Sequence, residues 1–403
     1  EIRLSLVGSE MCIRDSYKTV QDRENKTVKG FDVTTTNGLI TIANKKTINA
    51  TPSKEEQYTL KLTFVNYEGD QTGNATSTLS AKVMIQKEVI PQVVGDVCTN
   101  GENLATCITT LAGKSSASLT KIYHHDAKLT NGAGDSSYRY SGANPNNYVC
   151  FGSNESTCPT DNLYRIIGVF GNQVKLIKYD YGTTDELGTD GDYSKTYKEW
   201  GMDSTYKGTY GDGERIGVYY WNNTTQTNTW SESLLNKTNL NTNFINNIGE
   251  EWANKIATTT WKVGGNTYSN IYSKTPSVVY QNEIVNPVTT NTTDNATEYT
   301  AKIGLMYVSD YGFAAEPSAW TLTMGNYNNT TATSTNWMYM GLYEWTISRS
   351  ADFSYRAFDV YFDGYVFSGV VNFDYAVRPS FSLESSITYV SGSGSASDPM
   401  LIN

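Results

Sequence analysis

The first quarter of the chain has the apolar and polar pattern of short strands. Residues 58–67 alternate Leu and Phe with Thr and Lys, and residues 38–43 and 79–86 carry similar apolar runs bounded by turn-forming residues. A period of two is typical of strands that bury one face. We therefore expect residues 17–88 to form a small antiparallel β-sandwich.

The pattern changes at residues 89–97, where Pro91 and Gly95 interrupt the alternation. We interpret these residues as a linker between two domains. Beyond it, residues 163–180 contain two strand-like runs on either side of Gly171-Asn172. That dipeptide is typical of tight turns, so the segment predicts a β-hairpin.

Helical periodicity is concentrated in one region. Thr229 and Glu232 have the spacing of a capping box, and apolar residues then recur at every fourth position, at Phe244, Ile248, Trp252 and Ile256. Residues 181–215, rich in Gly, Asp and Tyr, are expected to form a long surface loop, and residues 301–314 a further strand. Strands followed by helices and then by more strands predict an α+β fold for residues 98–403.

Residues 357–379 alternate like a strand, yet many positions that would face solvent carry Tyr, Phe, Asp or Ser. Just before them, Trp337, Tyr339, Tyr343 and Trp345 lie close together. Trp and Tyr are enriched at binding surfaces because they bury much area with little loss of side-chain entropy. The alternative is that Trp337 and Trp345 are core residues, which we favour for Trp345.

Composition and charge narrow the class of protein. Only 18% of the 403 residues are charged, the formal net charge is -10, and the chain holds 33 Gly and 30 Tyr. This profile favours a β-rich extracellular protein, and the negative charge argues against a nucleic-acid partner. No apolar stretch is long enough to cross a bilayer, so we expect no membrane insertion by these residues.

The first sixteen residues, EIRLSLVGSEMCIRDS, do not resemble protein sequence. Read back into codons, LVGSEMCIRDS matches the adapter end of transposon-based sequencing libraries. We set residues 1–16 aside as a non-native artefact. The native start, with any signal or anchor, then lies outside the sequence.

Four cysteines remain once Cys12 is set aside, and they form two close pairs in the sequence: Cys98 with Cys107, and Cys150 with Cys158. The even number, the short polar intervals and the lack of CxxC favour two local disulfides in an oxidising compartment. The alternative is a zinc site, but the intervals fit common zinc spacings poorly.

Residues able to carry catalysis are scarce. The two histidines, His124 and His125, are neighbours that would point to opposite sides of an extended chain, so we expect a surface or interface pair and no shared metal. The acidic stretches 185–192 and 211–214 lack the spacing of a calcium-binding loop. We predict no catalytic residue, no metal and no cofactor.

Residues 348–383 lack a particular set of residue types. They contain no Lys, Glu, Gln, Met or Trp, although at the average frequency of the chain about six would be expected. The segment still carries Asp, Asn and Arg, so it is not simply an apolar strand. Every residue type that it does contain is reachable from AAC or AAT by changing only the two adenines, whereas Lys, Glu, Gln, Met and Trp are not.

This deficit resembles the variable region of proteins diversified by diversity-generating retroelements, which mutate adenines. Residues 138–403 are similar to the Firmicutes branch of this family in the order of YRYSGANPNNYVCF, LYRIIGVFGNQVKLIKYD, AKIGLMYVSDYGFA, YEWTIS, AVRP and VSGSGSASDP. The resemblance implies a C-type-lectin-like fold of the formylglycine-generating-enzyme type that displays varied side chains on a fixed backbone. Residues 17–88 loosely resemble camelysin-like, immunoglobulin-like β-domains of Gram-positive bacteria.

The resemblance divides the segment into scaffold and contact residues. The scaffold would comprise Ala357, Phe358, Val360, Gly364, Val366, Val370 and the block 376–379. The ligand-binding face would comprise Tyr355, Arg356, Asp359, Tyr361, Phe362, Tyr365, Phe367, Ser368, Asn372, Phe373, Asp374 and Tyr375, with Trp337 and Tyr339 beside them. The sugar-binding motifs of calcium-dependent lectins are absent, and the cysteines lie far from this segment in the sequence. Neither calcium-mediated sugar binding nor formylglycine formation is therefore expected.

Three functions are compatible with these observations. The first is a secreted or cell-surface receptor or adhesin of a Gram-positive-type bacterium, which binds a protein or glycan ligand at a cell or phage surface. The second is a non-diversified structural adhesin of the same fold, and the third is an extracellular glycan-active enzyme. We rank them in that order.

Overall fold

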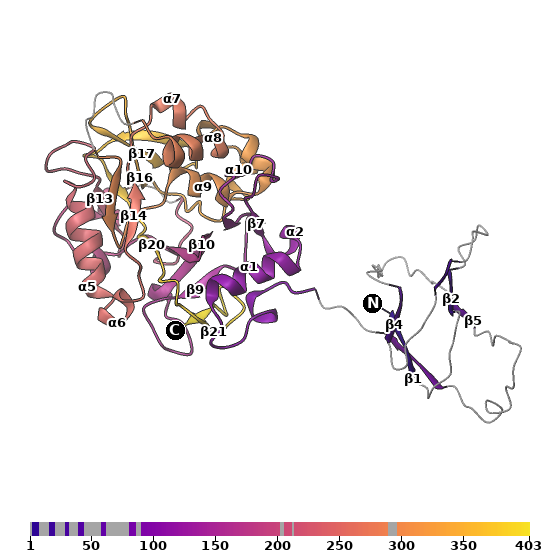
Figure 1. The fold of residues 1–403 in the computed structure, drawn as a ribbon. Coiled ribbons are helices and arrows are strands. Elements are labelled where there is room, and N and C mark those ends of the chain that lie inside the picture. Colours follow the sequence, from indigo (N-terminus) through magenta and orange to yellow (C-terminus); the bar gives the residue numbers. More distant parts are fainter. Residues whose placement is uncertain are drawn as a thin grey trace, which may run out of the picture. The chain divides into compact units, whose positions relative to one another are not determined.

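The computed structural model describes residues 90–201, 205–211, 213–288 and 296–403, together with the backbone of six strands within residues 2–85. The chain divides into two compact units, Glu1–Ile90 and Pro91–Asn403 (Figure 1). The expected domain boundary near residue 89 agrees with this division.

The first unit contains two three-stranded antiparallel sheets. Their strand orders are β4-β1-β6 and β3-β2-β5. The strands are β1 (Ile2–Val7), β2 (Ser16–Val20), β3 (Lys29–Phe31), β4 (Leu39–Ala43), β5 (Tyr58–Lys61) and β6 (Ser80–Ile85). Three of them, β4, β5 and β6, lie where the alternating pattern predicted strands, whereas β1 lies in the segment set aside as adapter-like. The side-chain packing of a sandwich lies outside the described residues.

The second unit is built around two larger sheets. One has the order β20-β11-β10-β8-β7, with β9 also paired to β10, and the other has the order β12-β13-β19-β16-β17-β18. The strands of the first sheet are β7 (Ile122–His124), β8 (Tyr138–Tyr140), β9 (Tyr148–Cys150), β10 (Leu163–Phe170), β11 (Gln173–Lys178) and β20 (Ser380–Ser382). Those of the second are β12 (Tyr193–Thr196), β13 (Gly217–Tyr220), β16 (Glu344–Arg349), β17 (Arg356–Val360), β18 (Val366–Val370) and β19 (Asp374–Ala376). Two short pairs complete the strands: β14 (Thr259–Lys262) with β15 (Glu298–Ala301), and β21 (Tyr389–Ser391) with β22 (Leu401–Ile402).

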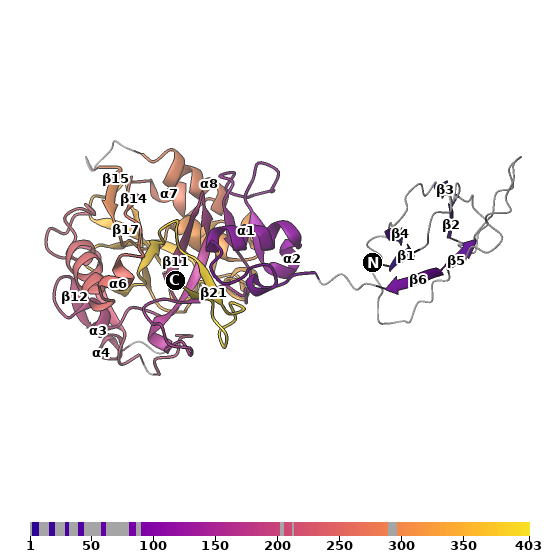
Figure 2. The same cartoon turned by 60° about the horizontal axis from the view of Figure 1, so that its bottom comes forward.

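Short helices surround these sheets. Helices α1 and α2 lie at the opposite end of the unit from α5 and α6 in both views (Figures 1 and 2). The α-helices are α1 (Leu104–Lys114), α2 (Ala117–Thr120), α3 (Thr184–Leu187), α4 (Tyr197–Trp200), α5 (Ile245–Asn247), α6 (Glu250–Ala253), α7 (Tyr268–Ile271), α8 (Pro276–Tyr280), α9 (Val308–Ala314) and α10 (Thr330–Thr333). Wide, π-type turns form η4 (Leu235–Phe244) and η5 (Gln281–Val285). Helices and sheets in separate groups make the unit α+β, as the sequence predicted.

The predicted hairpin at residues 163–180 is confirmed. Strands β10 and β11 pair antiparallel with Phe170 opposite Gln173, and Gly171 adopts a φ of 62° in the turn between them. A positive φ at this position suits glycine, which has no Cβ to clash with the backbone. The local sequence therefore determines this turn.

Other expectations were wrong where tertiary packing overrides the local pattern. Residues 301–314 end in helix α9 and not in a strand, and residues 181–215 contain α3, β12 and α4 in place of a long loop. Part of the expected linker, Val94–Asp96, forms a 3₁₀ helix whose Val94 is buried in the core of the second unit. Helix α9 is buried along its whole length, so it shows no amphipathic period.

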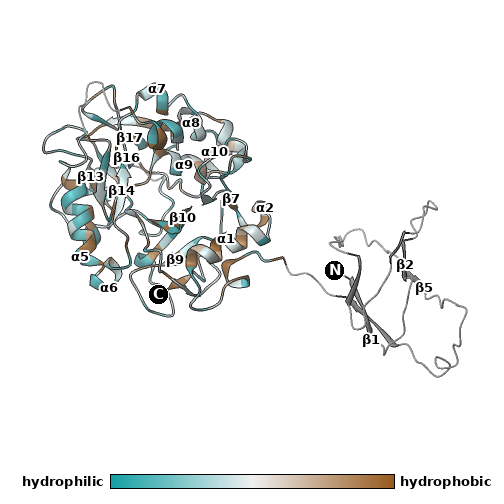
Figure 3. Ribbon diagram, in the orientation of Figure 1, coloured by the Kyte–Doolittle hydropathy of each residue, from teal (hydrophilic) through white to brown (hydrophobic). Residues whose placement is uncertain are grey.

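The predicted helical region is helical, but it begins later than the capping box indicated. Trp230–Glu232 forms a turn after Thr229, and the helical segment starts at Leu234. It continues through η4 and α5 and breaks at Gly249, whose φ is 79°. Figure 3 shows this segment as mostly teal with a few brown positions, in agreement with a largely polar sequence whose apolar side chains are buried.

The two large sheets are joined by the C-terminal segment itself. β19 pairs with β13 and β16 in one sheet, and β20, which begins four residues after β19 ends, pairs with β11 in the other. Between them, the guanidinium of Arg378 donates to both oxygens of Glu344 at 2.8 and 2.9 Å and to the Met338 carbonyl at 2.7 Å. Both charged side chains are buried. This pair fixes the segment that follows the predicted ligand-binding face to the centre of the unit.

Candidate ligand-binding face

The predicted variable segment, residues 348–383, supplies strands β17, β18 and β19 of the second sheet and the last two residues of β16. In the register of this sheet, Asp359 of β17 lies between Trp345 of β16 and Phe367 of β18. Directly paired residues present their side chains on the same side of a sheet. One side therefore carries this row together with Tyr361, two residues further along β17 from Asp359.

Aromatic rings cover this side of the sheet in an almost continuous layer. Ring centroids lie 4.5 Å apart for Tyr343 and Tyr361, 4.4 Å for Tyr361 and Tyr365, 5.5 Å for Tyr361 and Phe367, and 5.0 Å for Tyr343 and Tyr375. Further ring contacts extend the layer in both directions. We call the connected set the aromatic face: Trp200, Tyr268, Tyr272, Tyr343, Tyr361, Phe362, Tyr365, Phe367, Phe373 and Tyr375.

Hydrogen bonds from two tyrosine hydroxyls outside the hairpin fix the turn between β17 and β18. The N–H of Tyr361 donates to the Tyr365 carbonyl at 2.8 Å, and Gly364 adopts a φ of 104°. The hydroxyl of Tyr311 donates to the Gly364 carbonyl at 2.7 Å, and that of Tyr339 to the Phe362 carbonyl at 2.6 Å. These bonds to backbone atoms fix the turn without depending on the side chains that it displays.

The loop before β17 is held in the same way. The side-chain amide of Asn228 donates to the carbonyls of Ser350, Phe353 and Arg356 at 2.7, 3.0 and 2.7 Å. The carboxylate of Asp352 accepts from the N–H of Tyr268 at 2.7 Å. Buried Asn228 thus fixes a loop that exposes the side chains of Phe353 and Tyr355.

Large exposed apolar side chains are concentrated in this segment. Among the described residues, seven large hydrophobic side chains are exposed, and three of them are Phe353 (44%), Tyr355 (43%) and Phe373 (48%). Exposed aromatic side chains beside a partly buried aromatic layer are typical of interaction sites.

The structure brings most of the predicted contact residues to the surface of this region. Two are exposed, Tyr355 and Phe373, and eight are half-buried: Tyr339, Arg356, Tyr361, Phe362, Tyr365, Phe367, Asn372 and Asp374. Four are buried: Trp337, Asp359, Ser368 and Tyr375. These four are corrections to the predicted face, since a buried side chain is not available for contact in the conformation observed.

The physical reason for burial differs among the four. Trp337 donates its indole N–H to the Tyr140 carbonyl at 2.8 Å and packs against the guanidinium of Arg165, so it belongs to the core. Ser368 projects from β18 on the side of Phe358, with which it is paired, and that side faces the core. Tyr375 is covered by neighbouring rings of the aromatic face, among them Tyr343.

Asp359 is the most unusual of the four. It is fully buried, and neither carboxyl oxygen has a hydrogen-bond partner among the described residues. Burial raises the pKa of this carboxyl well above its ordinary value; the Gly369 N–H and the charge of Arg356 act in the opposite direction but are weaker effects. An unpartnered buried carboxyl is costly and is usually associated with function.

The scaffold residues behave as expected. Ala357, Phe358, Val360, Gly364, Val366 and the block 376–379 are buried, and only Val370 is half-exposed. Trp345 is buried too, with its indole N–H donating to the Tyr219 carbonyl at 3.0 Å. The scaffold set that the resemblance implies therefore coincides with buried positions, except for Val370.

Sequence reasoning missed four aromatic residues of this region, Trp200, Tyr268, Tyr272 and Phe353, and it named Tyr343 in an aromatic cluster without placing it on the face. Phe353 lies inside the segment that lacks Lys, Glu, Gln, Met and Trp, so it could have been included on that ground. Trp200, Tyr268 and Tyr272 reach the face from α4 and the α7 region, far away in the sequence. No local signal marks them.

Charged groups border the aromatic face. Asp374 accepts from the hydroxyl of Ser194 at 2.7 Å and pairs with the ammonium of Lys195 at 3.3 Å. The guanidinium of Arg356 donates to the Ser368 carbonyl at 2.6 Å and lies near the rings of Phe353 and Tyr355. In contrast to Asp359, both charged groups have partners.

The histidine pair is only partly as expected. His124 and His125 do point to opposite sides, but only His124 is exposed. His125 is buried against Phe313 and Trp320, accepts from the Ala133 N–H at 3.1 Å, and has its pKa lowered to about 2, mainly by burial. It is a neutral core residue.

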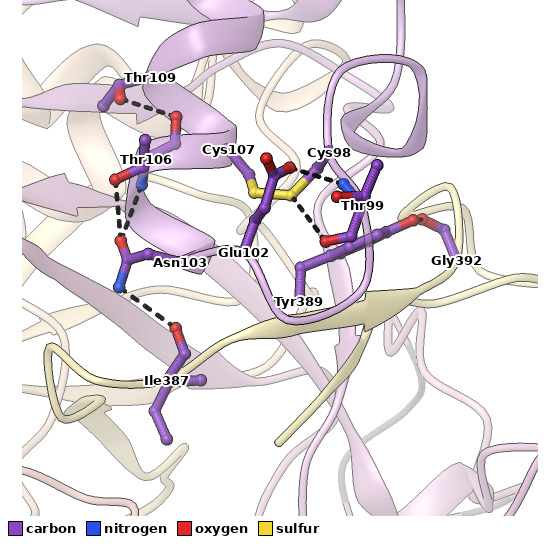
Figure 4. Close-up of a disulfide and its surroundings, with 10 residues drawn as sticks. All are labelled: Cys98, Thr99, Glu102, Asn103, Thr106, Cys107, Thr109, Ile387, Tyr389 and Gly392. Atoms are coloured by element: carbon purple, nitrogen blue, oxygen red, sulfur yellow. Dashed lines mark hydrogen bonds between the residues drawn. A yellow bond between two sulfur atoms is a disulfide. The ribbon is translucent and has the colours of Figure 1, made fainter.

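Both predicted cysteine pairs lie at disulfide distance. Cα atoms are 5.4 Å apart in the Cys98–Cys107 disulfide and 5.7 Å apart in the Cys150–Cys158 disulfide. Figure 4 shows the first of them beside Glu102, which accepts from the Thr99 N–H at 2.7 Å. Cys98, Cys107 and Glu102 form the one group in the described part of the chain whose ligand atoms lie close enough together to hold a metal ion. The two sulfur atoms of this group are, however, bonded to each other.

Comparison with known proteins adds no relative: the chain matches no family model, no curated protein and no solved structure. Within the described ranges, no helix has the length and apolar content needed to span a bilayer. Two disulfides are compatible with an oxidising, extracellular environment.

Proposed function

We propose that this protein is a secreted or surface-exposed receptor or adhesin that binds a protein or glycan ligand through the aromatic face and the adjoining loop with Phe353 and Tyr355. The proposal includes a C-type-lectin-like fold for residues 98–403 and diversification of residues 348–383 by an adenine-mutating retroelement. The host would be a Gram-positive-type bacterium. No catalysis is required.

One observation carries the proposal. The segment that lacks Lys, Glu, Gln, Met and Trp supplies most of the rings of the aromatic face and three of the seven exposed large hydrophobic side chains among the described residues. Composition and surface location are independent properties, and both single out the same residues. Aromatic side chains of this kind dominate the binding energy of interfaces.

The way in which the backbone is held supports diversification. Tyr311, Tyr339 and Asn228 lie outside residues 348–383 and bond to backbone carbonyls within them. Backbone carbonyls are present whatever the side chain, so these contacts would survive substitution. A scaffold of this kind tolerates new contact residues without refolding.

Binding is tested on an array of bacterial and phage surface proteins and glycans. The parent chain is compared with a Tyr355→Ala/Phe373→Ala double variant, and with Leu119→Ala/Val278→Ala as a control that removes exposed apolar side chains elsewhere. We expect the first variant to lose binding by roughly tenfold or more and the control to retain it. Binding that survives the first variant unchanged would refute the proposed face.

Diversification is tested on the DNA. Codons for Tyr355, Tyr361, Tyr365 and Phe373 should share a third base, and an adenine-rich near-copy of the segment should lie nearby beside a reverse transcriptase gene. Mixed third bases without such a copy would exclude diversification and leave the non-diversified adhesin. In that case residues 352–375 would be constant between strains.

A further inference from the structure

The carboxyl group of Asp359 is on the same side of the sheet as the aromatic face. Its paired neighbours, Trp345 and Phe367, and the next residue on that side, Tyr361, all present rings there. Its charge would also interact with the phenol groups of Tyr343, Tyr361 and Tyr375. Asp359 therefore lies on the same side of the sheet as the aromatic face and is paired there with Trp345 and Phe367.

No side chain among the described residues satisfies the Asp359 carboxyl. Neither oxygen has a hydrogen bond of ordinary geometry, and the backbone donor that acts on the carboxyl is the N–H of Gly369. Arg356 is the cation whose charge acts on it, but the Nη1 atom of Arg356 is directed to the Ser368 carbonyl. The buried carboxyls Glu344 and Asp310, in contrast, each bind a cationic side chain of the same chain.

The layer above this carboxyl is suited to a cation. Tyr343, Tyr361, Tyr365 and Phe367 are half-buried, so each ring keeps part of its surface accessible. The faces of aromatic rings attract cations, and the attraction strengthens when water is excluded. A cation that entered between these rings would gain two interactions: the attraction of the ring faces and an ion pair with the Asp359 carboxylate.

We infer that the aromatic face binds an arginine side chain of a protein partner, which inserts between the rings of Tyr343, Tyr361 and Tyr375 and pairs with the carboxylate of Asp359. Two free oxygens match the two-pronged donor geometry of a guanidinium, whereas an ammonium is a point charge that needs only one. The planar guanidinium also stacks on aromatic rings. The tyrosine rings must rotate to admit it, and side-chain rotamer changes are common at interfaces.

The extent of the aromatic face favours a protein as the source of this group. Ring contacts connect Trp200 of α4 to Tyr272, which follows α7, and exposed Phe353 and Tyr355 continue the apolar surface beyond Arg356. Central aromatic and arginine anchors surrounded by apolar and polar contacts are typical of protein interfaces. The net charge of -10 gives further complementarity to a basic partner.

This inference rests on the proposed function, since it names the group that the same face would bind. It is tested by selecting a phage-displayed random peptide library on the full chain. Peptides that bind the parent but not the Tyr355→Ala/Phe373→Ala variant are taken as binders of the face. We expect arginine to be enriched in these peptides above its frequency in the library.

The decisive measurement uses a selected peptide in which arginine is replaced by citrulline, which keeps the shape and loses the charge. We expect this change to weaken binding to the parent protein roughly tenfold. Binding to Asp359→Asn should weaken less than about twofold, because that variant lacks the carboxylate with which the arginine would pair. Asp374→Asn is the matched control and should keep the full tenfold loss. Asp359→Leu, which has no polar group, serves as a second variant should the asparagine side chain reorganise the rings.

Each outcome has a defined meaning. Binders of the face without arginine, with lysine in its place, or with the same citrulline loss in Asp359→Asn, overturn the inference and leave the proposed function intact. A face that binds glycans on the array but selects no peptide also overturns it. The absence of any ligand for the face, in both the array and the library, overturns the inference and the proposed function together.

Discussion

The unpartnered carboxyl of Asp359 makes a prediction about stability that needs no ligand. Asn has nearly the same size as Asp but does not ionise, so Asp359→Asn removes the charge and keeps the packing. In the folded protein the carboxyl is fully buried and its pKa is raised by burial. The unfolded chain ionises this carboxyl freely at neutral pH, and each pH unit between its ordinary pKa and the raised folded one corresponds to about 1.4 kcal/mol. Asparagine cannot ionise, so we expect Asp359→Asn to raise the free energy of unfolding by about 1–3 kcal/mol near neutral pH.

The gain should depend on pH with a defined sign. A raised pKa means that the folded protein holds this proton more tightly than the unfolded chain does. As the pH rises above about 4, the unfolded carboxyl ionises first, and the parent loses stability relative to the variant. Near pH 4 the unfolded carboxyl is only about half ionised, so the two proteins should differ in stability by no more than about 0.5 kcal/mol.

Urea unfolding at about pH 4 and about pH 7.5 measures this effect. All eight tryptophans lie between residues 200 and 345, so tryptophan fluorescence reports the second unit alone. Buried Glu283, whose pKa is raised to about 7, makes the parent itself depend on pH, and the difference between parent and variant removes that contribution. Asp374→Asn is the control, because that carboxyl is half-exposed and already paired. An equal or lower stability of Asp359→Asn at about pH 7.5 would refute the reasoning.

Three further predictions concern the scaffold. Replacing Cys150 and Cys158 by Ser should lower the free energy of unfolding by about 2–3 kcal/mol through a more flexible unfolded chain, measured by urea unfolding with and without reductant. Arg378→Met should destabilise the second unit by about 3–5 kcal/mol because it leaves Glu344 charged and buried, and adding Glu344→Gln should recover part of that loss in a double-mutant cycle. Trp337→Phe should lower the melting temperature through its lost hydrogen bond while leaving binding within about twofold of the parent, the reverse of what we expect for Tyr355→Ala/Phe373→Ala. A loss of binding without loss of stability in Trp337→Phe would return this residue to the contact set.

If Asp359 both destabilises the fold and pairs with a ligand, its two predicted effects have one origin. A buried carboxyl without a partner is already positioned to pair with a cation of a ligand. Until that ligand binds, the unpaired carboxyl lowers the stability of the folded protein. Binding residues often reduce stability in this way. The two measurements are independent, since one uses urea and the other uses peptide.

Several features of this protein follow from the sequence alone. Gly171-Asn172 predicted the β10–β11 hairpin, and the short intervals between cysteines predicted both disulfides. Alternation separated buried Phe358, Val360 and Val366 from surface positions. These features are local: a turn, a short loop or a strand period depends on residues that are near one another in the chain.

Only the tertiary structure decided the rest. Helix α9 is buried on every side, so its sequence carries no period that distinguishes a helix from a strand. Asp359 lies on the side of β17 that alternation assigns to the surface, but it is buried there, on the side of the sheet that also carries the stacked rings of Tyr375 in β19 and of Tyr343, which precedes β16. Trp200 and Tyr268 join the aromatic face from distant elements. Burial by residues far apart in the chain leaves no trace in local spacing, and for that reason the sequence identified the strands of the face while the structure identified the carboxyl beneath it.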